Sequence, residues 1–197
     1  MFRVAGCRWM LLAAAIGGYG CTSYGQVLTF SPLLRSQFVV HDPYQWGWDL
    51  ELGARDSAAT WWAGLHYARM SGEVPFREDG YDVRDASRRF GVAGGLVSAL
   101  TSVVALEYGI HLDHVQLHRA VAGISSGWVS SVKGTAIALG ASTRLRIKLG
   151  GVASAYVGLD AGYRKVQEQR IEHSFVDRPF SDAPYIGVLA GLQLRLQ

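Results

Sequence analysis

Three histidines are the first residues whose types and spacing could do chemistry. On a helix, His111, His114 and His118 would line one face, where they could bind a metal ion. On a strand, His111 and His114 point to opposite faces and cannot share an ion. The flanking segment Glu107–Ile110 favours a strand, so no metal site is predicted. The sequence also predicts no cofactor.

An acid pair accompanies one of these histidines. Glu107, His111 and Asp113 share one face of a strand, and Ser125 has the matching parity on the next strand. Together they could form a Ser-His-acid arrangement, which is recognised by geometry rather than by spacing. We prefer the interpretation in which these acids and His111 belong to a salt-bridge network. An enzyme therefore remains the alternative, with His111, Glu107, Asp113 and Ser125 as its catalytic residues.

A basic row is the third group with potential chemistry. Arg144, Arg146 and Lys148 follow one another at every second position. In a channel such a row would favour anions. We expect it instead to pair with Asp160 and with other acids across a filled interior, because enclosed charges need partners.

The segments that must position these residues alternate strictly between two faces. Ile137–Leu149 carries Ile, Leu and Ala on one face and small or basic residues on the other. Ile186–Leu196 repeats the pattern. A period of two over ten or more residues predicts long β-strands with one apolar face.

The alternation and the turn signals predict about eight antiparallel strands, with ten as the next even number. The predicted strands are 45–55, 60–70, 88–98, 104–115, 120–130, 135–149, 152–166 and 185–196. Gly150-Gly151 predicts a tight hairpin, and Val132–Gly134 a further turn. Two long polar loops, 71–87 and 167–184, fall on opposite ends of this arrangement, although bacterial barrels keep long loops at one end.

Three features favour an up-and-down transmembrane β-barrel whose apolar face meets lipid and whose polar lumen is filled. The polar face is rich in glycine, which a solvated outer face would not require. The same face collects a mixed charge network: Asp49, Glu51, Arg55, Glu107, His111, Asp113, Arg144, Arg146, Lys148, Asp160, Arg164 and Arg195. The apolar face carries aromatic residues near strand ends, as expected for interfacial girdles: Trp46, Trp48, Trp61, Tyr67, Phe90, Tyr108 and Tyr163.

The N-terminus has the pattern of an export signal. Residues 1–21 combine two arginines, a short apolar run and small residues, and the run is too short to span a membrane. Cys21 stands where a bacterial lipoprotein signal places its lipidated cysteine, so it is the lipidation candidate. We predict a signal peptide over 1–21, a lead segment over 22–43 and a barrel over 44–197. With Cys7 in the signal, the mature domain has no cysteine pair for a disulfide.

From residue 44 onward the chain resembles the small outer-membrane β-barrels of the OmpA-domain and OmpX type, and Gly191–Gln197 resembles their terminal strand signal. This resemblance implies a bacterial outer-membrane protein with a structural or loop-mediated interaction role. Its partners would be outer-membrane lipid, the barrel assembly machinery and an extracellular partner at the loops. The near-neutral mature charge does not favour nucleic acid. The alternatives are an outer-membrane lipid hydrolase, of lipid A deacylase or phospholipase type, and a secreted lipocalin-like barrel with an apolar cavity.

Overall fold

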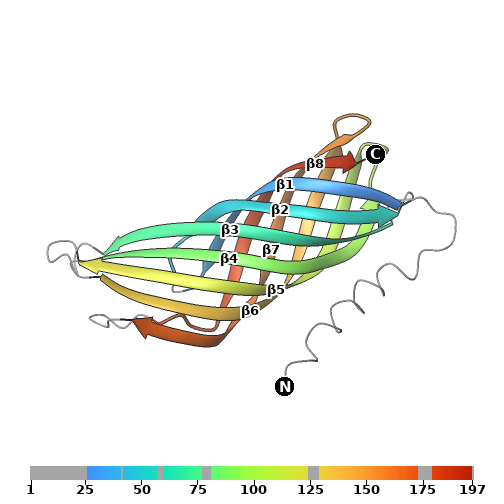
Figure 1. Ribbon diagram of the computed structural model, residues 1–197. Helices are drawn as coiled ribbons and strands as arrows, with labels where there is room; N and C mark the ends of the chain where they lie inside the picture. The colour runs from blue at the N-terminus through green and yellow to red at the C-terminus, as the bar shows by residue number, and fades with distance from the viewer. Residues whose placement is uncertain are drawn as a thin grey trace, which may run out of the picture.

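The chain forms a closed antiparallel β-barrel in which every strand pairs with its sequence neighbours (Figure 1). The computed structural model describes residues 26–40, 42–56, 60–76, 81–123, 129–172 and 179–196. These residues form eight strands. The strands are β1 (Gln26–Val39), β2 (Gln45–Asp56), β3 (Trp61–Phe76), β4 (Tyr81–Ala99), β5 (Val104–Gly123), β6 (Val129–Lys148), β7 (Ala153–Glu172) and β8 (Ala183–Leu196). The prediction of an all-β, up-and-down barrel is confirmed.

The barrel closes by pairing its first strand with its last. Leu34 on β1 lies opposite Ala190 on β8, and Phe38 lies opposite Ile186. The strands form because apolar and polar residues alternate along them, and this register keeps the two sets on separate faces. No helix in the described part of the chain has the length and apolar character needed to cross a membrane.

The strand count was predicted correctly, but two strand assignments were wrong. The lead segment 22–43 contains a full strand of the barrel, β1, so the barrel begins at Gln26 and not at residue 44. The segments 104–115 and 120–130 were predicted as separate strands, but the first lies entirely in β5, which continues to Gly123. The turn predicted at Val132–Gly134 lies inside β6. The amphipathic pattern simply continues through these positions.

These corrections place all the longer connections at one end. Residues 71–76 and 81–87 are paired strand rather than loop, since Gly72 lies opposite Asp85. The connections 57–60, 100–103 and 149–152 lie at the end where β1 starts and β8 stops. The connections 40–44, 77–80, 124–128 and 173–182 lie at the other end. Because bacterial barrels keep their short turns in the periplasm, this second end is the extracellular one.

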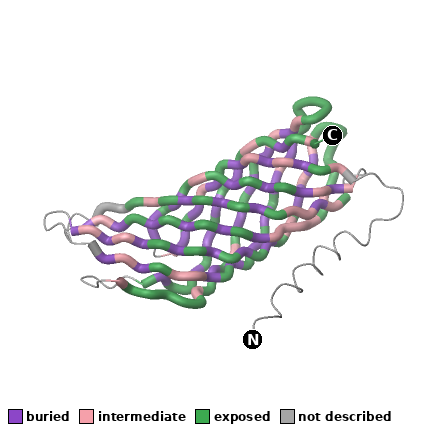
Figure 2. Tube along the Cα trace, in the orientation of Figure 1, coloured by how far each residue is buried: buried purple, intermediate pink, exposed green. Residues whose placement is uncertain are grey.

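The apolar face of the sheet points outward. Leu34 is 66% exposed and Leu139 60% exposed, whereas Glu107 and Arg164 on the inner face are each 1% exposed. Figure 2 shows this alternation of buried and exposed residues along the middle of the barrel. A lipocalin-like barrel has the opposite arrangement, so that alternative is wrong.

Aromatic side chains mark both ends of the apolar face. Tyr67, Phe90 and Tyr163 are exposed toward the extracellular end. Trp48 packs beside Tyr67, with 5.4 Å between ring centroids. Tyr108 is exposed toward the periplasmic end. The extracellular residues lie where an interfacial girdle of a membrane barrel is expected, and Trp46 is exposed at the same end. Trp61, which was also predicted for a girdle, is only partly exposed.

Candidate functional site: an ion-paired lumen

The centre of the lumen holds a closed ring of alternating basic and acidic side chains, which we call the central ring. Its members are Arg35, Asp49, His66, Asp113, His111 and Asp160. They come from β1, β2, β3, β5 and β7. Each member lies beside the next, and the last closes on the first, so the ring ties together strands from around the barrel.

Most distances in the central ring are those of hydrogen bonds between charged groups, and the contact between His66 and Asp49 is a longer ion pair. An Arg35 Nη atom lies 2.7 Å from Asp49 Oδ2, and another lies 2.6 Å from Asp160 Oδ2. His111 lies 2.7 Å from Asp160 through Nε2 and 3.2 Å from Asp113 through Nδ1. His66 lies 2.8 Å from Asp113 through Nε2 and 3.5 Å from Asp49 through Nδ1. Both nitrogens of each imidazole therefore face a carboxylate.

Glycines make room for the central ring. A Cβ atom on Gly91 would lie 2.9 Å from His66 Nε2 and would collide with Asp113. A Cβ atom on Gly140 would lie 2.5 Å from His111 Nε2. Glycines on the inner face therefore leave the space into which polar side chains of the neighbouring strands reach.

A second layer lies toward the periplasmic end. Glu107 forms ion pairs with two arginines: its Oε1 lies 3.0 Å from Arg55 Nη1 and 3.2 Å from Arg146 Nε. The Tyr156 hydroxyl lies 2.8 Å from Arg55 Nη2 and 3.1 Å from Glu107 Oε1. These four side chains come from β2, β5, β6 and β7, so they cross the full width of the lumen.

A further ion pair lies on the same inner face of β2 and β6. Arg144 Nη1 lies 2.7 Å from Glu51 Oε2. The guanidinium of Arg144 also lies over the Trp62 ring, 4.7 Å from its centroid. A planar guanidinium can form a forked ion pair and stack on an aromatic face at the same time, which a lysine cannot do equally well.

A third layer of ion pairs lies at the extracellular mouth. Asp42 bridges two arginines, with 2.6 Å to Arg119 and 2.6 Å to Arg164. Arg119 also reaches Asp85 through two bonds of 2.7 Å. The Phe180 ring, from the connection before β8, lies over the Arg119 guanidinium at 4.5 Å.

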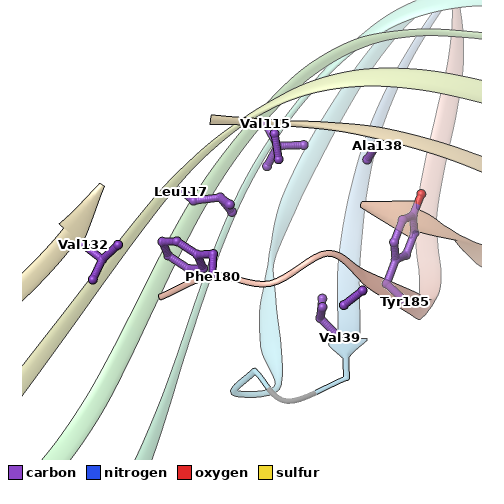
Figure 3. Packing of buried hydrophobic residues seen from close by; sticks show 9 residues of the cluster. Val39, Val115, Leu117, Val132, Ala138, Phe180 and Tyr185 are labelled. Carbon is purple, nitrogen blue, oxygen red and sulfur yellow. The ribbon is translucent and has the colours of Figure 1, made fainter. Parts of the chain in front are cut away.

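Phe180 belongs to an apolar cluster just inside this mouth (Figure 3). Its buried members are Val39, Val115, Leu117, Val132, Ala136, Ala138, Phe180, Ala183 and Tyr185. The cluster begins in the mouth layer, where Val132 lies opposite Arg119, and reaches the central ring, where the Tyr185 hydroxyl lies 3.3 Å from His111 Nε2. The guanidinium of Arg89 lies 4.9 Å from the Tyr185 ring centroid. Apolar and ionic contacts together therefore fill the upper lumen.

Ten of the twelve residues predicted for the charge network are buried in the lumen. The other two are not. Lys148 is exposed, and its Nζ donates to the Ser102 carbonyl at 3.0 Å. Arg195 is half-buried near the end of β8. Both lie at the periplasmic rim, where alternation continues but the lumen has ended.

Several lumen residues escaped the sequence analysis. Arg35 was missed because β1 was not recognised, although Thr29, Ser31 and Gln37 alternate with it on one face. His66 shares the inward face of β3 with Gly64, so parity could have found it. The remaining missed members are Asp42, Asp85, Arg89 and Arg119.

The described residues contain only part of the proposed Ser-His-acid group, the pair of His111 and Asp113 at 3.2 Å. His111 contacts Asp113 and Asp160, but Glu107 lies in the periplasmic layer with Arg55. Ser125 and Cys21 lie outside the described residues. His66, His111 and Asp113 do place three metal-ligand atoms within 4.8 Å of one another, and in the central ring these same atoms already serve as hydrogen-bonding partners.

The comparisons with known proteins identify the fold. Neisserial surface protein A matches 87% of this chain and 97% of its own at a TM-score of 0.53, with 14% identity. A major outer-membrane protein of Thermus thermophilus matches 86% and 99% at a TM-score of 0.62, with 10% identity. The N-terminal barrel domain of Pseudomonas aeruginosa OprF matches 86% and 100% at a TM-score of 0.52, with 10% identity.

This chain has the fold of a small bacterial outer-membrane β-barrel. The resemblance predicted from the sequence is thereby confirmed at the level of fold, and an outer-membrane location agrees with that fold and with the apolar outer belt. No protein-family model and no curated protein matches the chain in sequence. The outer-membrane barrel is therefore recognised here by shape and by side-chain alternation.

Proposed function

We propose that the protein is a closed outer-membrane barrel that acts as a structural scaffold and does not conduct ions. The observation that carries this proposal is that buried charged side chains cross the lumen at three levels. Ion pairs cross it at the periplasmic layer, at the central ring and at the mouth, where Asp42 bridges Arg119 and Arg164. An anion channel would need its cations free to meet the permeant ion. Here Arg144 and Arg146 are taken up by Glu51 and Glu107.

The lengths of the strands support a role for the extracellular hairpins. Strands β5, β6 and β7 each have 20 residues, whereas a tilted transmembrane strand needs about 9–11. Roughly half of each strand therefore continues beyond the lipid on the extracellular side. A paired sheet of this kind is a rigid support, and the hairpins it carries are the natural contact for an extracellular partner.

Conductance measurements test the scaffold proposal. The purified full chain, folded in detergent, is inserted into planar bilayers beside an open general porin as the positive control. We expect no steady conductance steps from this chain under conditions in which the porin conducts. Regular ohmic steps from the wild-type barrel would overturn the proposal.

A cellular experiment tests the hairpin role. Residues 77–80 and 124–128 are replaced by Gly/Ser segments of equal length, and the periplasmic turn 149–152 is replaced in the control. We expect cell adhesion or aggregation that depends on the protein to be lost only with the extracellular replacements. Equal loss with the periplasmic replacement would contradict the role.

A further inference from the structure

The outer face of the sheet carries two arginines at the level of the extracellular aromatic girdle, where Trp48 lies opposite Arg69. Arg69 on β3 and Arg88 on β4 are exposed and lie directly opposite each other in the register. Like charges directly opposite on neighbouring strands destabilise a sheet. Among the described residues, neither arginine forms a salt bridge, so this repulsion has no internal compensation.

A nearby arginine shows that the arrangement is specific. Arg84 lies on the same outer face of β4, four residues from Arg88, and its guanidinium lies 3.1 Å from Glu73. The chain therefore supplies an acid where β3 and β4 continue farther out, but places two arginines against each other nearer the membrane.

The two arginines border an open depression of about 650 Å³ on the outer face of β3–β7. Its basic side chains are Arg69, Arg88, His118, Lys133 and Arg170. Small residues, Ala86 and Gly134 among them, form part of its floor. One acid, Glu168, also lines it.

Lys133 is the member of this set with an acidic partner. Its Nζ lies 3.0 Å from Glu172, and the Lys133 hydrogen bond lowers the pKa of the Glu172 carboxyl. Among the described residues, Arg69, Arg88 and Arg170 form no salt bridge, so the depression keeps a net positive charge, and Arg69 and Arg88 are the two of these arginines that lie directly opposite each other.

The height of the depression relative to the membrane follows from the girdle. Tyr67 and Phe90 lie opposite each other in the register, and Arg69 and Arg88 follow two residues farther toward the extracellular end. Two strand residues correspond to about 7 Å along the strand. Interfacial aromatics lie at the level of the headgroups, so the arginines lie at or just above the headgroups of the outer leaflet.

We propose that Arg69 and Arg88 bind the phosphate of an outer-leaflet lipid headgroup. Two guanidinium groups side by side offer several N–H donors to one phosphate, and Arg–phosphate pairs are among the stronger charge-assisted hydrogen bonds. The acyl chains of the same lipid would lie along the apolar face below Tyr67 and Phe90. The site lies outside the lumen and does not depend on whether the lumen conducts.

A binding titration with a matched control tests this site. The folded full chain is titrated in mixed micelles with diphosphorylated lipid A and, separately, with lipid A from which both phosphates have been removed. Arg88→Gln is compared with Arg84→Gln, which removes the same charge from the same face of β4. We expect only the phosphorylated lipid to bind tightly, and Arg88→Gln to weaken it about tenfold or more, with a larger loss in Arg69→Gln/Arg88→Gln. Arg84→Gln should bind like the wild type.

Three results would overturn the proposal. They are equal binding of the dephosphorylated lipid, equal weakening by Arg84→Gln, and displacement of the lipid by inorganic phosphate or by a soluble sulfated polysaccharide at equal concentration. The last would indicate a general anion site or a polysaccharide site. The heat-dependent mobility of each variant in SDS gels checks that the barrel is folded. The conductance test of the scaffold proposal has a separate outcome, because it measures ion flow through the lumen and not binding on the outer face.

Discussion

Arg88 and Arg89 are neighbours in the chain and have opposite surroundings. Arg89 points into the lumen, where it contacts Gln37, Asp113 and the Tyr185 ring. Arg88 points outward and lies opposite another arginine. A buried charge is very costly unless it is paired, whereas a charge facing water or headgroups has no such requirement. Arg89 in the lumen therefore needs its partners for the barrel to be stable. Arg88 on the outer face does not, and its guanidinium can bind a ligand.

The largest expected effect comes from breaking the central ring. Asp113→Asn leaves His66, His111 and Arg89 without their shared carboxylate. We expect the free energy of unfolding to fall by about 3–5 kcal/mol, because uncompensated buried charge remains. The free energy of unfolding is measured by urea titration of the protein in lipid vesicles, with tryptophan fluorescence as the signal. As the control, Glu168→Gln on the outer face should change stability by less than about 0.5 kcal/mol, and a similar loss there would contradict the contrast between the two faces.

The next comparison uses the adjacent arginines directly. Arg89→Gln should lower the free energy of unfolding by about 2–3 kcal/mol, because its buried partners lose a charged donor. Arg88→Gln makes the same chemical change one residue away and should be neutral within about 0.5 kcal/mol. Equal losses in the same urea experiment would mean that burial does not distinguish the two arginines.

A double-mutant cycle separates pairing from packing. Glu51→Leu alone leaves Arg144 buried without its carboxylate partner and should lower the free energy of unfolding by about 3 kcal/mol. Adding Arg144→Met replaces the whole pair with apolar side chains, and we expect most of that loss to be recovered. If the two single losses simply add, the pair is not energetically coupled, and the packing of Arg144 on Trp62 would be the main contribution.

The smallest effect is expected at an exposed carboxylate. Asp56 accepts hydrogen bonds from the Thr60 hydroxyl, at 2.7 Å, and from the Thr60 backbone N–H, at 2.6 Å, at the β2–β3 turn. Its slight burial raises its pKa, but these bonds outweigh that effect, so the pKa of Asp56 lies below its ordinary value of 3.8. Their contribution is present above that value and is lost as the pH falls through the lower folded pKa.

Asp56→Ala should therefore cost less than about 1 kcal/mol at pH 7, since solvent screens the group. The difference from the wild type should shrink as the pH drops below about 4. Unfolding curves at pH 7 and pH 3 measure it, and a difference that grows on acidification would contradict the assignment.

The sequence predicted the architecture because alternation is a local property. Ile137–Leu149 and Ile186–Leu196 carry a two-residue period that reports which side chains share a face. The membership of Arg55, Glu107 and Asp160 in the lumen followed from parity alone. Alternation carries no information on where a strand ends inside a longer amphipathic run, so β5 was divided.

The partners within the lumen could not be predicted. Arg35 and Asp160 meet across the barrel seam, although they are 125 positions apart in the chain. Their contact depends on the register between β1 and β8 and on the space left by glycines such as Gly140. The register between strands and the space beside a side chain are set only when the barrel closes. The alternation of residues along one strand cannot predict them.

The seam between β1 and β8 has a consequence for the order of assembly. The other neighbouring strands are hairpins, whose ends are close in the chain, whereas β1 and β8 must meet across almost the whole sequence. Loop-closure entropy makes such a contact late, and both edges stay open until then. Because β1 carries Arg35, the central ring is incomplete before that step. The charged side chains can therefore stay hydrated until β1 pairs with β8. The desolvation free energy of the central ring then belongs to the last step of folding.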